Sequence, residues 1–176
     1  MSLPALPSFS FQVLQPAHVP ALIQYLQGLS ALTRSRFAPH AADEAGIRAF
    51  YEGPQPHTGY VALLPGGELA GYFVVWRSYL PHDAARWQSY GLAPHPVTDF
   101  TLAPSVGDAW QGQGLAGPML GWVEAACKSL GASRLLLWGG VQAGNSAAVR
   151  FYEKHGFVYA GSFEHHGTNH DMYKNL

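Results

Sequence analysis

Residues 99–116, DFTLAPSVGDAWQGQGLA, decide the fold of this chain. A strand-like run from Asp99 to Val106 is followed by a short turn and then by a glycine-rich loop that opens a helix. Such a loop leaves backbone N–H groups unpaired at the positive end of the helix dipole, where a phosphate can bind. Glycine has no Cβ, so the backbone can approach a ligand closely. The stretch therefore predicts a phosphate-binding turn between a strand and a helix.

Two interpretations of this loop compete. In the first, Gly112, Gly114 and Gly117 form the G-x-G-x-x-G of a dinucleotide-binding fold, and the chain is an NAD-dependent oxidoreductase. That fold expects an acidic residue at the end of the next strand, about 20 residues further on. The next strand-like run, 134–138, is followed by Gly-Gly-Val with no acid, and too little chain remains for further βαβ repeats. The context favours the second interpretation.

The second interpretation takes Gln111, Gly114 and Ala116 as Q-x-x-G-x-A, which resembles the pyrophosphate loop of the GNAT N-acetyltransferase superfamily. Residues 145–157, NSAAVRFYEKHGF, are similar to a second block of that family, N-x-x-A-x-x-x-Y-x-(K/R)-x-G-F. The two blocks stand in the expected order, with a helix and a strand between them. The resemblance implies the GNAT fold, which is α+β in class. Its mixed, mostly antiparallel central sheet is flanked by helices, and one βαβ crossover holds the acyl-CoA loop.

Length and composition predict a single globular domain over residues 1–176. Lys and Arg together number 10 against 11 acids, so no net charge draws the chain to nucleic acid or to an anionic membrane. No apolar run approaches the ~20 residues that span a bilayer. The N-terminal MSLPALPSFSF has no basic start and too short an apolar block for a signal peptide, so we expect a cytoplasmic protein. The one cysteine, Cys127, excludes an internal disulfide and is expected in the core.

Apolar periodicity and turn residues predict the order of the elements. Strands are expected at 9–14, 60–64, 69–76, 97–106, 134–141, 157–164 and 171–176, and helices at 16–29, 42–51, 112–130 and 145–155. The apolar stripe of the third helix is Leu115, Leu120, Val123, Cys127 and Leu130. Residues 77–96 form an unusually long connection, which is either a surface excursion or homodimer contact, or a substrate lid.

The resemblance implies a site for acetyl-CoA as cosubstrate. Backbone amides between Gly112 and Gly117 would hold the pyrophosphate, and Gln111 opens the loop where many relatives carry Arg. The strand that ends near Val106 would pair with the pantetheine arm. The family's donor to the thioester carbonyl would lie near Ser105 and Val106. The expected loop residues are Gln111, Gly112, Gln113, Gly114, Leu115, Ala116 and Gly117.

Asn145 and Tyr152 complete the cofactor-binding set that the resemblance implies. Asn is a favoured helix N-cap residue, and the family adds a contact from this position to the pantetheine arm. Tyr152 occupies the position of the general acid in many GNAT enzymes. A phenol of ordinary pKa, ~10, keeps its proton at neutral pH and can donate it to the departing thiolate. Simple packing of the ring on its helix is the alternative.

The base that deprotonates the amine is harder to find. Asp99, near the start of the motif strand, is the first candidate, because strand carboxylates there often serve GNAT enzymes. The alternative is a solvated residue at a turn. Glu164, in the closing hairpin, is a weaker candidate.

Several further side chains have other interpretations. A group in the closing hairpin looks like a metal cluster but has no further convergent ligand, so no metal is expected; it comprises His165, His166, His170 and Asp171. The family often shows an acidic residue and Met in its final strand, which Asp171 and Met172 match. Arg34 and Arg36 lie where the first GNAT helices frame the acceptor pocket. They could hold a carboxylate or a phosphate, or could face solvent.

These observations predict an acetyl-CoA-dependent N-acetyltransferase. A primary amine of a small molecule or a peptide would attack the thioester directly in a ternary complex. The alternative function is a non-catalytic acyl-CoA-binding or regulatory domain on the same fold.

Overall fold

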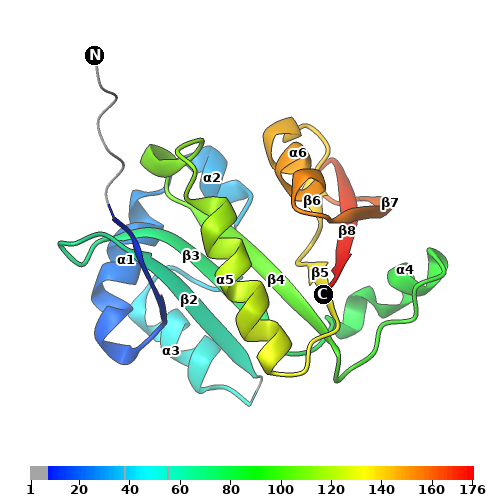
Figure 1. The fold of residues 1–176 in the computed structure, drawn as a ribbon, viewed down its shortest axis with the longest axis horizontal. Helices are drawn as coiled ribbons and strands as arrows, with labels where there is room; N and C mark the ends of the chain where they lie inside the picture. The colour runs from blue at the N-terminus through cyan, green and yellow to red at the C-terminus, as the bar shows by residue number, and fades with distance from the viewer. Residues whose placement is uncertain (1–7, 38, 55) are drawn as a thin grey trace. The chain divides into compact units, whose positions relative to one another are not determined.

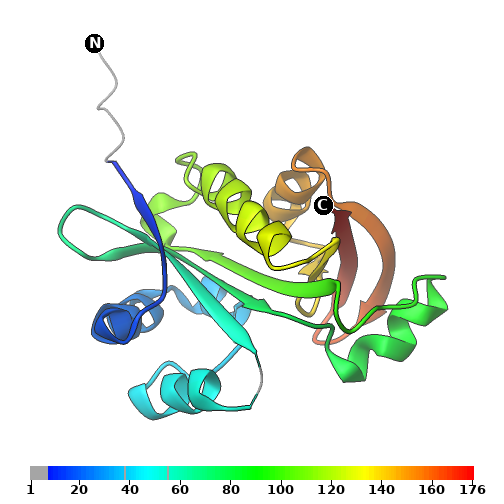
Figure 2. The same ribbon diagram turned by 60° about the horizontal axis from the view of Figure 1, so that its bottom comes forward.

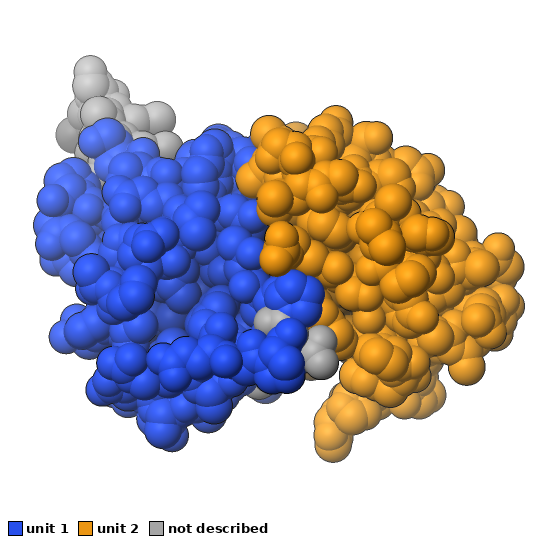
Figure 3. Space-filling model, turned by 90° about the horizontal axis from the view of Figure 1, so that it is seen from below, with its two compact units in different colours: residues 1–74, 104–123 blue, residues 75–103, 124–176 orange. Residues whose placement is uncertain are grey.

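A computed structural model of the chain describes residues 8–37, 39–54 and 56–176 (Figure 1). The prediction about a signal peptide concerns residues 1–11, and residues 1–7 of that segment lie outside the described residues. The chain divides into two compact units, residues 1–74 with 104–123 and residues 75–103 with 124–176 (Figure 3). That residues 1–176 form a single domain stays a prediction.

Helices and strands are interspersed along the whole described chain. In order, the elements are β1 (Ser10–Val13), η1 (Pro16–His18), α1 (Val19–Gly28), α2 (Ala31–Ser35), α3 (Glu44–Glu52), β2 (His57–Leu63), β3 (Leu69–Trp76), η2 (Pro81–Asp83), α4 (Ala84–Ser89), β4 (Asp99–Val106), η3 (Asp108–Trp110), α5 (Ala116–Ser129), β5 (Arg134–Leu137), β6 (Val141–Gln142), α6 (Ser146–Lys154), β7 (Val158–Glu164) and β8 (Thr168–Asn175). All the strands and helices expected from the sequence are present, with shifted ends. The short helices α2 and α4 were not predicted.

The strand pairing confirms the predicted α+β class. Hydrogen bonds join the strands in the order β1-β2-β3-β4-β5-β8-β6, and β7 pairs with β8. The pairs β1–β2, β5–β8, β6–β8 and β7–β8 are antiparallel, whereas β4 and β5 are parallel and are connected through α5. This is the single βαβ crossover that was expected. The dinucleotide-binding alternative is wrong, because it requires a mostly parallel sheet.

In the first unit, helices cover both faces of the strands β2 and β3. Figure 2 shows α1 and α3 on one face and α5 on the other. The strands are buried almost throughout, and α1 adds Leu22, Tyr25 and Leu26 to the core. The helix α3 begins at Glu44, two residues later than predicted, because the carboxylate of its N-cap Asp43 accepts the backbone N–H of Gly46 at 2.7 Å.

Three predictions about α5 and β5 need correction. The helix begins at Ala116 rather than Gly112, because the loop before it contains two glycines at positive φ. The strand expected over 134–141 is divided into β5 and β6 by Gly139 and Gly140, with φ of 65° and 67°. Leu130 is 48% exposed, because it lies beyond the end of α5, whereas the rest of the apolar stripe, including Cys127, is buried as predicted.

In the second unit, the connection 77–96 packs against the closing hairpin β7–β8. Trp87 of α4 is buried, and the ring of Tyr90 lies against Gly161. The guanidinium of Arg86 donates to the fully buried carboxylate of Asp171 at 2.5 Å and to Asp83 at 2.7 Å. Removing one partner of such a buried ion pair strongly destabilises a protein, because the other charge is left buried and uncompensated. The connection is therefore anchored within its own unit by a buried ion pair.

Candidate functional site

The loop before α5 has the local geometry of an anion-binding turn. Gly112 and Gly114 have φ of 70° and 81°, a conformation that glycine adopts without strain. Among the described residues, no group accepts a hydrogen bond from the backbone N–H of Gly112, Gly114, Ala116 or Gly117. These donors lie at the N-terminus of a 14-residue helix, where the dipole favours negative charge. Pro118 lacks a backbone N–H, but it lies in the first turn of α5, where the N–H groups have no partner within the helix.

The end of β4 is fixed within the first unit by side chains from two directions. Ser105 is buried, and its hydroxyl lies 2.8 Å from the hydroxyl of Tyr25 on α1. The carbonyl of Val106 accepts the amide of Gln111 at 3.1 Å. The next residue, Gly107, donates its N–H to Ala70 of β3 at 2.9 Å. The Ser105 hydroxyl therefore has a protein partner, and the donor to a thioester near Ser105 and Val106 stays a prediction.

The helix α6 explains the spacing of the second sequence block. Asn145 is its N-cap, with Oδ1 accepting the N–H of Ala148 at 3.4 Å, as the residue type predicted. Gly156 ends the helix at a φ of 84°, so the chain turns sharply and buries Phe157. The rings of Phe157 and Tyr152 are 5.3 Å apart. In this block Asn145 therefore starts the helix and Gly156 ends it. Tyr152 lies on the buried face of the helix and packs against Phe157.

Tyr152 is buried, but its hydroxyl has no hydrogen-bond partner in the described part of the chain. Burial raises the pKa of Tyr152 above the ordinary 10.0 of a phenol. The proton therefore stays on the oxygen throughout the neutral range. A hydroxyl without a protein partner is available to donate to a group that enters the site.

Asp99 has surroundings that favour a structural role. It is 1% exposed, and both its carboxylate oxygens accept from the guanidinium of Arg134, one of them also from the backbone N–H of His95 at 2.8 Å. These bonds join the end of the connection 77–96 to β5. Asp99 as the catalytic base stays a prediction, and it is not a solvated turn residue.

Replacing Asp99 with Asn is expected to lower the free energy of unfolding by about 3 kcal/mol, because it leaves a largely buried guanidinium without its counter-ion. Denaturant titration of both proteins measures this loss. A substitution that leaves unfolding unchanged but depresses the acidic limb of the kcat/KM profile would contradict the structural role and identify a base.

Comparison with known proteins agrees with this geometry. A profile described as "Acetyltransferase (GNAT) family" matches residues 25–157, more than half of the chain. The chain belongs to the GNAT acetyltransferase family. Among curated protein sequences, none matches it significantly.

Solved structures of GNAT proteins share the fold at low sequence identity. The GNAT domain of S. lividans PAT has a TM-score of 0.73 at 19% identity, over 94% of this chain and 89% of that one. A chimera of spermidine N-acetyltransferase SpeG from Vibrio cholerae and hSSAT gives 0.67 at 15%, over 95% of each. The ribosomal-protein-S18-alanine N-acetyltransferase of Escherichia coli gives 0.65 at 18%, over 96% of this chain and 94% of that one.

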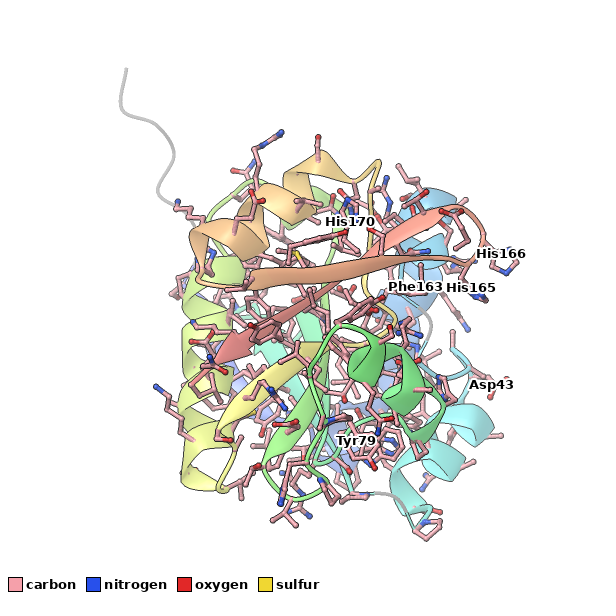
Figure 4. The ribbon with its side chains drawn as sticks, turned by 90° about the vertical axis from the view of Figure 1, so that its right-hand side faces the viewer. Asp43, Tyr79, Phe163, His165, His166 and His170 are labelled. Carbon is pink, nitrogen blue, oxygen red and sulfur yellow. The ribbon has the colours of Figure 1, made fainter. Side chains whose placement is uncertain are left out.

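The histidines of the closing hairpin do not converge in this GNAT chain. His165 and His166 lie at the tip, whereas His170 lies further along β8 and bonds Ser162 at 2.8 Å (Figure 4). Asp171 is engaged by Arg86. The part of the chain that the structure describes contains no group of three or more His, Cys, Asp or Glu able to hold a metal.

Two further sequence candidates also have local partners. Glu164 accepts the hydroxyl of Thr168 at 2.6 Å in the hairpin turn. Arg34 donates to the carbonyls of Gln27 and Leu29, at 2.8 and 3.0 Å, and so caps the end of α1. Arg36 also has an interaction partner. None of the helices in residues 8–37, 39–54 and 56–176 is long and apolar enough to cross a membrane. The cytoplasmic location stays a prediction.

Sequence reasoning missed a partly buried hydrogen-bond network that connects α3 and β3. The hydroxyls of Tyr51 and Tyr72 bond to each other, and Tyr72 bonds Nε2 of His40 at 2.7 Å. Nδ1 of His40 lies 2.8 Å from the carbonyl of Ala41, so Nδ1 carries the proton and Nε2 accepts. The three residues are far apart in sequence, and no local pattern connects them.

This GNAT chain is expected to lose stability as the pH falls through 6.5. Burial lowers the pKa of His40 below 6.5, although the bond to Ala41 opposes this, and burial also lowers that of His57. The unfolded chain then binds protons that the folded chain does not, so acid favours unfolding. Melting curves above and below pH 6.5 test this. The dependence should be weaker in His40→Gln, and an unchanged dependence would contradict the assignment.

Proposed function

We propose that the chain is an acetyl-CoA-dependent N-acetyltransferase that acts on a primary amine of a small molecule or a peptide. The observation that carries the proposal is the loop before α5, where the N–H groups of Gly112, Gly114, Ala116 and Gly117 have no acceptor among the described residues. These donors would hold the pyrophosphate of coenzyme A, and main-chain groups near Ser105 and Val106 would hold the thioester. Asn145 would contact the pantetheine arm.

Tyr152 is proposed as the general acid. In direct transfer, the amine nitrogen attacks the thioester carbonyl, the C–S bond breaks, and the thiolate takes the phenolic proton. The nitrogen loses one proton to a base and ends as an amide. A neutral phenol whose hydroxyl has no partner among the described residues suits proton donation to a thiolate.

A covalent acyl-cysteine intermediate is not part of this proposal. The chain has one cysteine, Cys127, which is buried. Burial raises the pKa of its thiol to about 12, so the nucleophilic thiolate is scarce at neutral pH. This supports direct attack by the amine.

Two experiments test the proposed function. Calorimetry should show binding of coenzyme A and none of NAD. A free-thiol assay with acetyl-CoA should then be run against amino acids and against polyamines and alanine-containing peptides, since two of the structural neighbours are a spermidine N-acetyltransferase chimera and a ribosomal-protein-S18-alanine N-acetyltransferase. Coenzyme A binding without turnover on any amine would favour the non-catalytic alternative.

A further inference from the structure

Four polar side chains join α2 to the loop before α5 within the first unit. Asp108 accepts from the backbone N–H of Ser30 at 2.8 Å, from its hydroxyl at 2.9 Å, and from the hydroxyl of Thr33 at 2.5 Å. The amide of Gln111 donates to Thr33 Oγ1 at 3.2 Å and to the carbonyl of Val106 at 3.1 Å. We refer to Ser30, Thr33, Asp108 and Gln111 as the Thr33 latch.

Thr33 is the hub of the latch. Its single hydroxyl proton goes to the carboxylate of Asp108, so its oxygen can accept only from donors such as the amide of Gln111. The bond to the carboxylate is charge-assisted, which makes it about twice as strong as a neutral one. Loss of this hydroxyl would disconnect Gln111 from α2, because Val106 is the only other acceptor of its amide in the described chain.

The loop has few other tethers that could fix its shape. The N–H of Trp110 bonds the carbonyl of Gly107 at 2.8 Å, and that of Gln113 bonds Trp110 at 3.3 Å. Both bonds lie within the segment itself and hold its first half. Fixing the backbone of each loose residue costs about 1–2 kcal/mol. A loop that is already ordered avoids this cost when it binds a ligand.

We propose that the Thr33 latch holds the loop in its phosphate-binding conformation, and that Gln111 works through this latch rather than as a phosphate ligand. The inference rests on the proposed coenzyme A site. Thr33 and Asp108 are then positioning residues, because they act through the loop.

The first test is Thr33→Val, which removes the hydroxyl and keeps the branched shape. Its Kd for coenzyme A is expected to rise about 10-fold, the loss that corresponds to one net hydrogen bond. The inhibition constant of 3′-phospho-ADP, which carries the pyrophosphate, should rise by the same factor, and that of pantetheine should not change. Thr33→Ser keeps the hydroxyl and should therefore bind coenzyme A with the wild-type affinity. The control is Ser35→Ala, because this α2 hydroxyl bonds only Leu32 among the described residues.

The second test is a double-mutant cycle between Gln111→Ala and Thr33→Val. If the two residues act in one latch, the double variant should bind coenzyme A no more weakly than the worse single variant. Independent contributions would multiply the two losses instead. If Thr33→Val does not fold, Gln111→Ala alone tests the latch, because it removes the amide that bonds Thr33, and wild-type affinity in this variant would overturn the proposal.

The outcomes separate the latch from the proposed function. Wild-type protein that binds coenzyme A, with Thr33→Val binding equally well, would overturn the latch alone. Equal losses for 3′-phospho-ADP and pantetheine would overturn it too, because they would indicate general damage. A folded wild-type protein that does not bind coenzyme A would overturn both.

Discussion

Replacing Gly114 with valine is expected to abolish measurable binding of coenzyme A. Nothing described lies within 4 Å of a Cβ built at this position. The valine side chain would therefore stand in open space beside the N–H groups that the pyrophosphate needs. The φ of 81° would also strain a β-branched residue and shift the loop. Calorimetry with coenzyme A measures the effect.

Gly91 provides a matched control for the strain. Its φ is 80°, and a Cβ there also meets nothing within 4 Å, but it lies in the connection 77–96. Gly91→Val should therefore lose a similar amount of stability and bind coenzyme A as the wild type does. If Gly114→Val kept an affinity close to that of Gly91→Val, the loop would not be the pyrophosphate site.

Replacing Tyr152 with phenylalanine is expected to lower kcat by ~10²–10⁴-fold, the usual contribution of a positioned acid. The affinity for acetyl-CoA should stay within a few-fold, because the proton is needed only in the transition state. Stability should change little, since the substitution keeps the ring and removes a hydroxyl that has no partner in the described chain. Steady-state kinetics and melting curves of the same preparations measure these effects.

Tyr159 is the control for the loss of a phenol in the same unit. It lies on β7, is 54% exposed and bonds Ser162 at 2.9 Å. Tyr159→Phe should keep the wild-type kcat. A stably folded Tyr152→Phe protein with wild-type turnover would show that Tyr152 only packs against α6 and Phe157.

The sequence predicted best those features that depend on neighbouring residues. The N-cap Asn145 and the glycines of the loop act within one helix or one turn. Their residue types therefore carry the geometry directly. Together with apolar periodicity, these features were enough to predict the α+β class and the crossover through α5.

The partners of the site residues could not be read from the sequence, because they come from distant segments. Gln111 bonds Thr33, 78 residues away, and Asp99 bonds Arg134, 35 residues away. A carboxylate beside a strand looks the same in sequence whether it faces a substrate or a buried arginine. The anchoring of the connection 77–96 depends on another such pair, Arg86 and Asp171.

Helix and strand ends were missed for a related reason. Periodicity continued through Gly112 and through the Gly139–Gly140 pair, but the backbone at these glycines adopts a positive φ that ends regular structure. The helix α2 has five residues and no buried side chain, so it has no apolar stripe to predict it. Its place is fixed by the bonds of Ser30 and Thr33 to Asp108.

Initial-velocity kinetics with both substrates test the central claim most directly. Thiol release should be measured while acetyl-CoA and an active amine are varied together, with mass spectrometry of the amine product. Direct transfer in a ternary complex predicts release that depends on both substrates, intersecting double-reciprocal lines and one acetylated amine per thiol. Parallel lines, or thiol release without an acetylated amine, would contradict it.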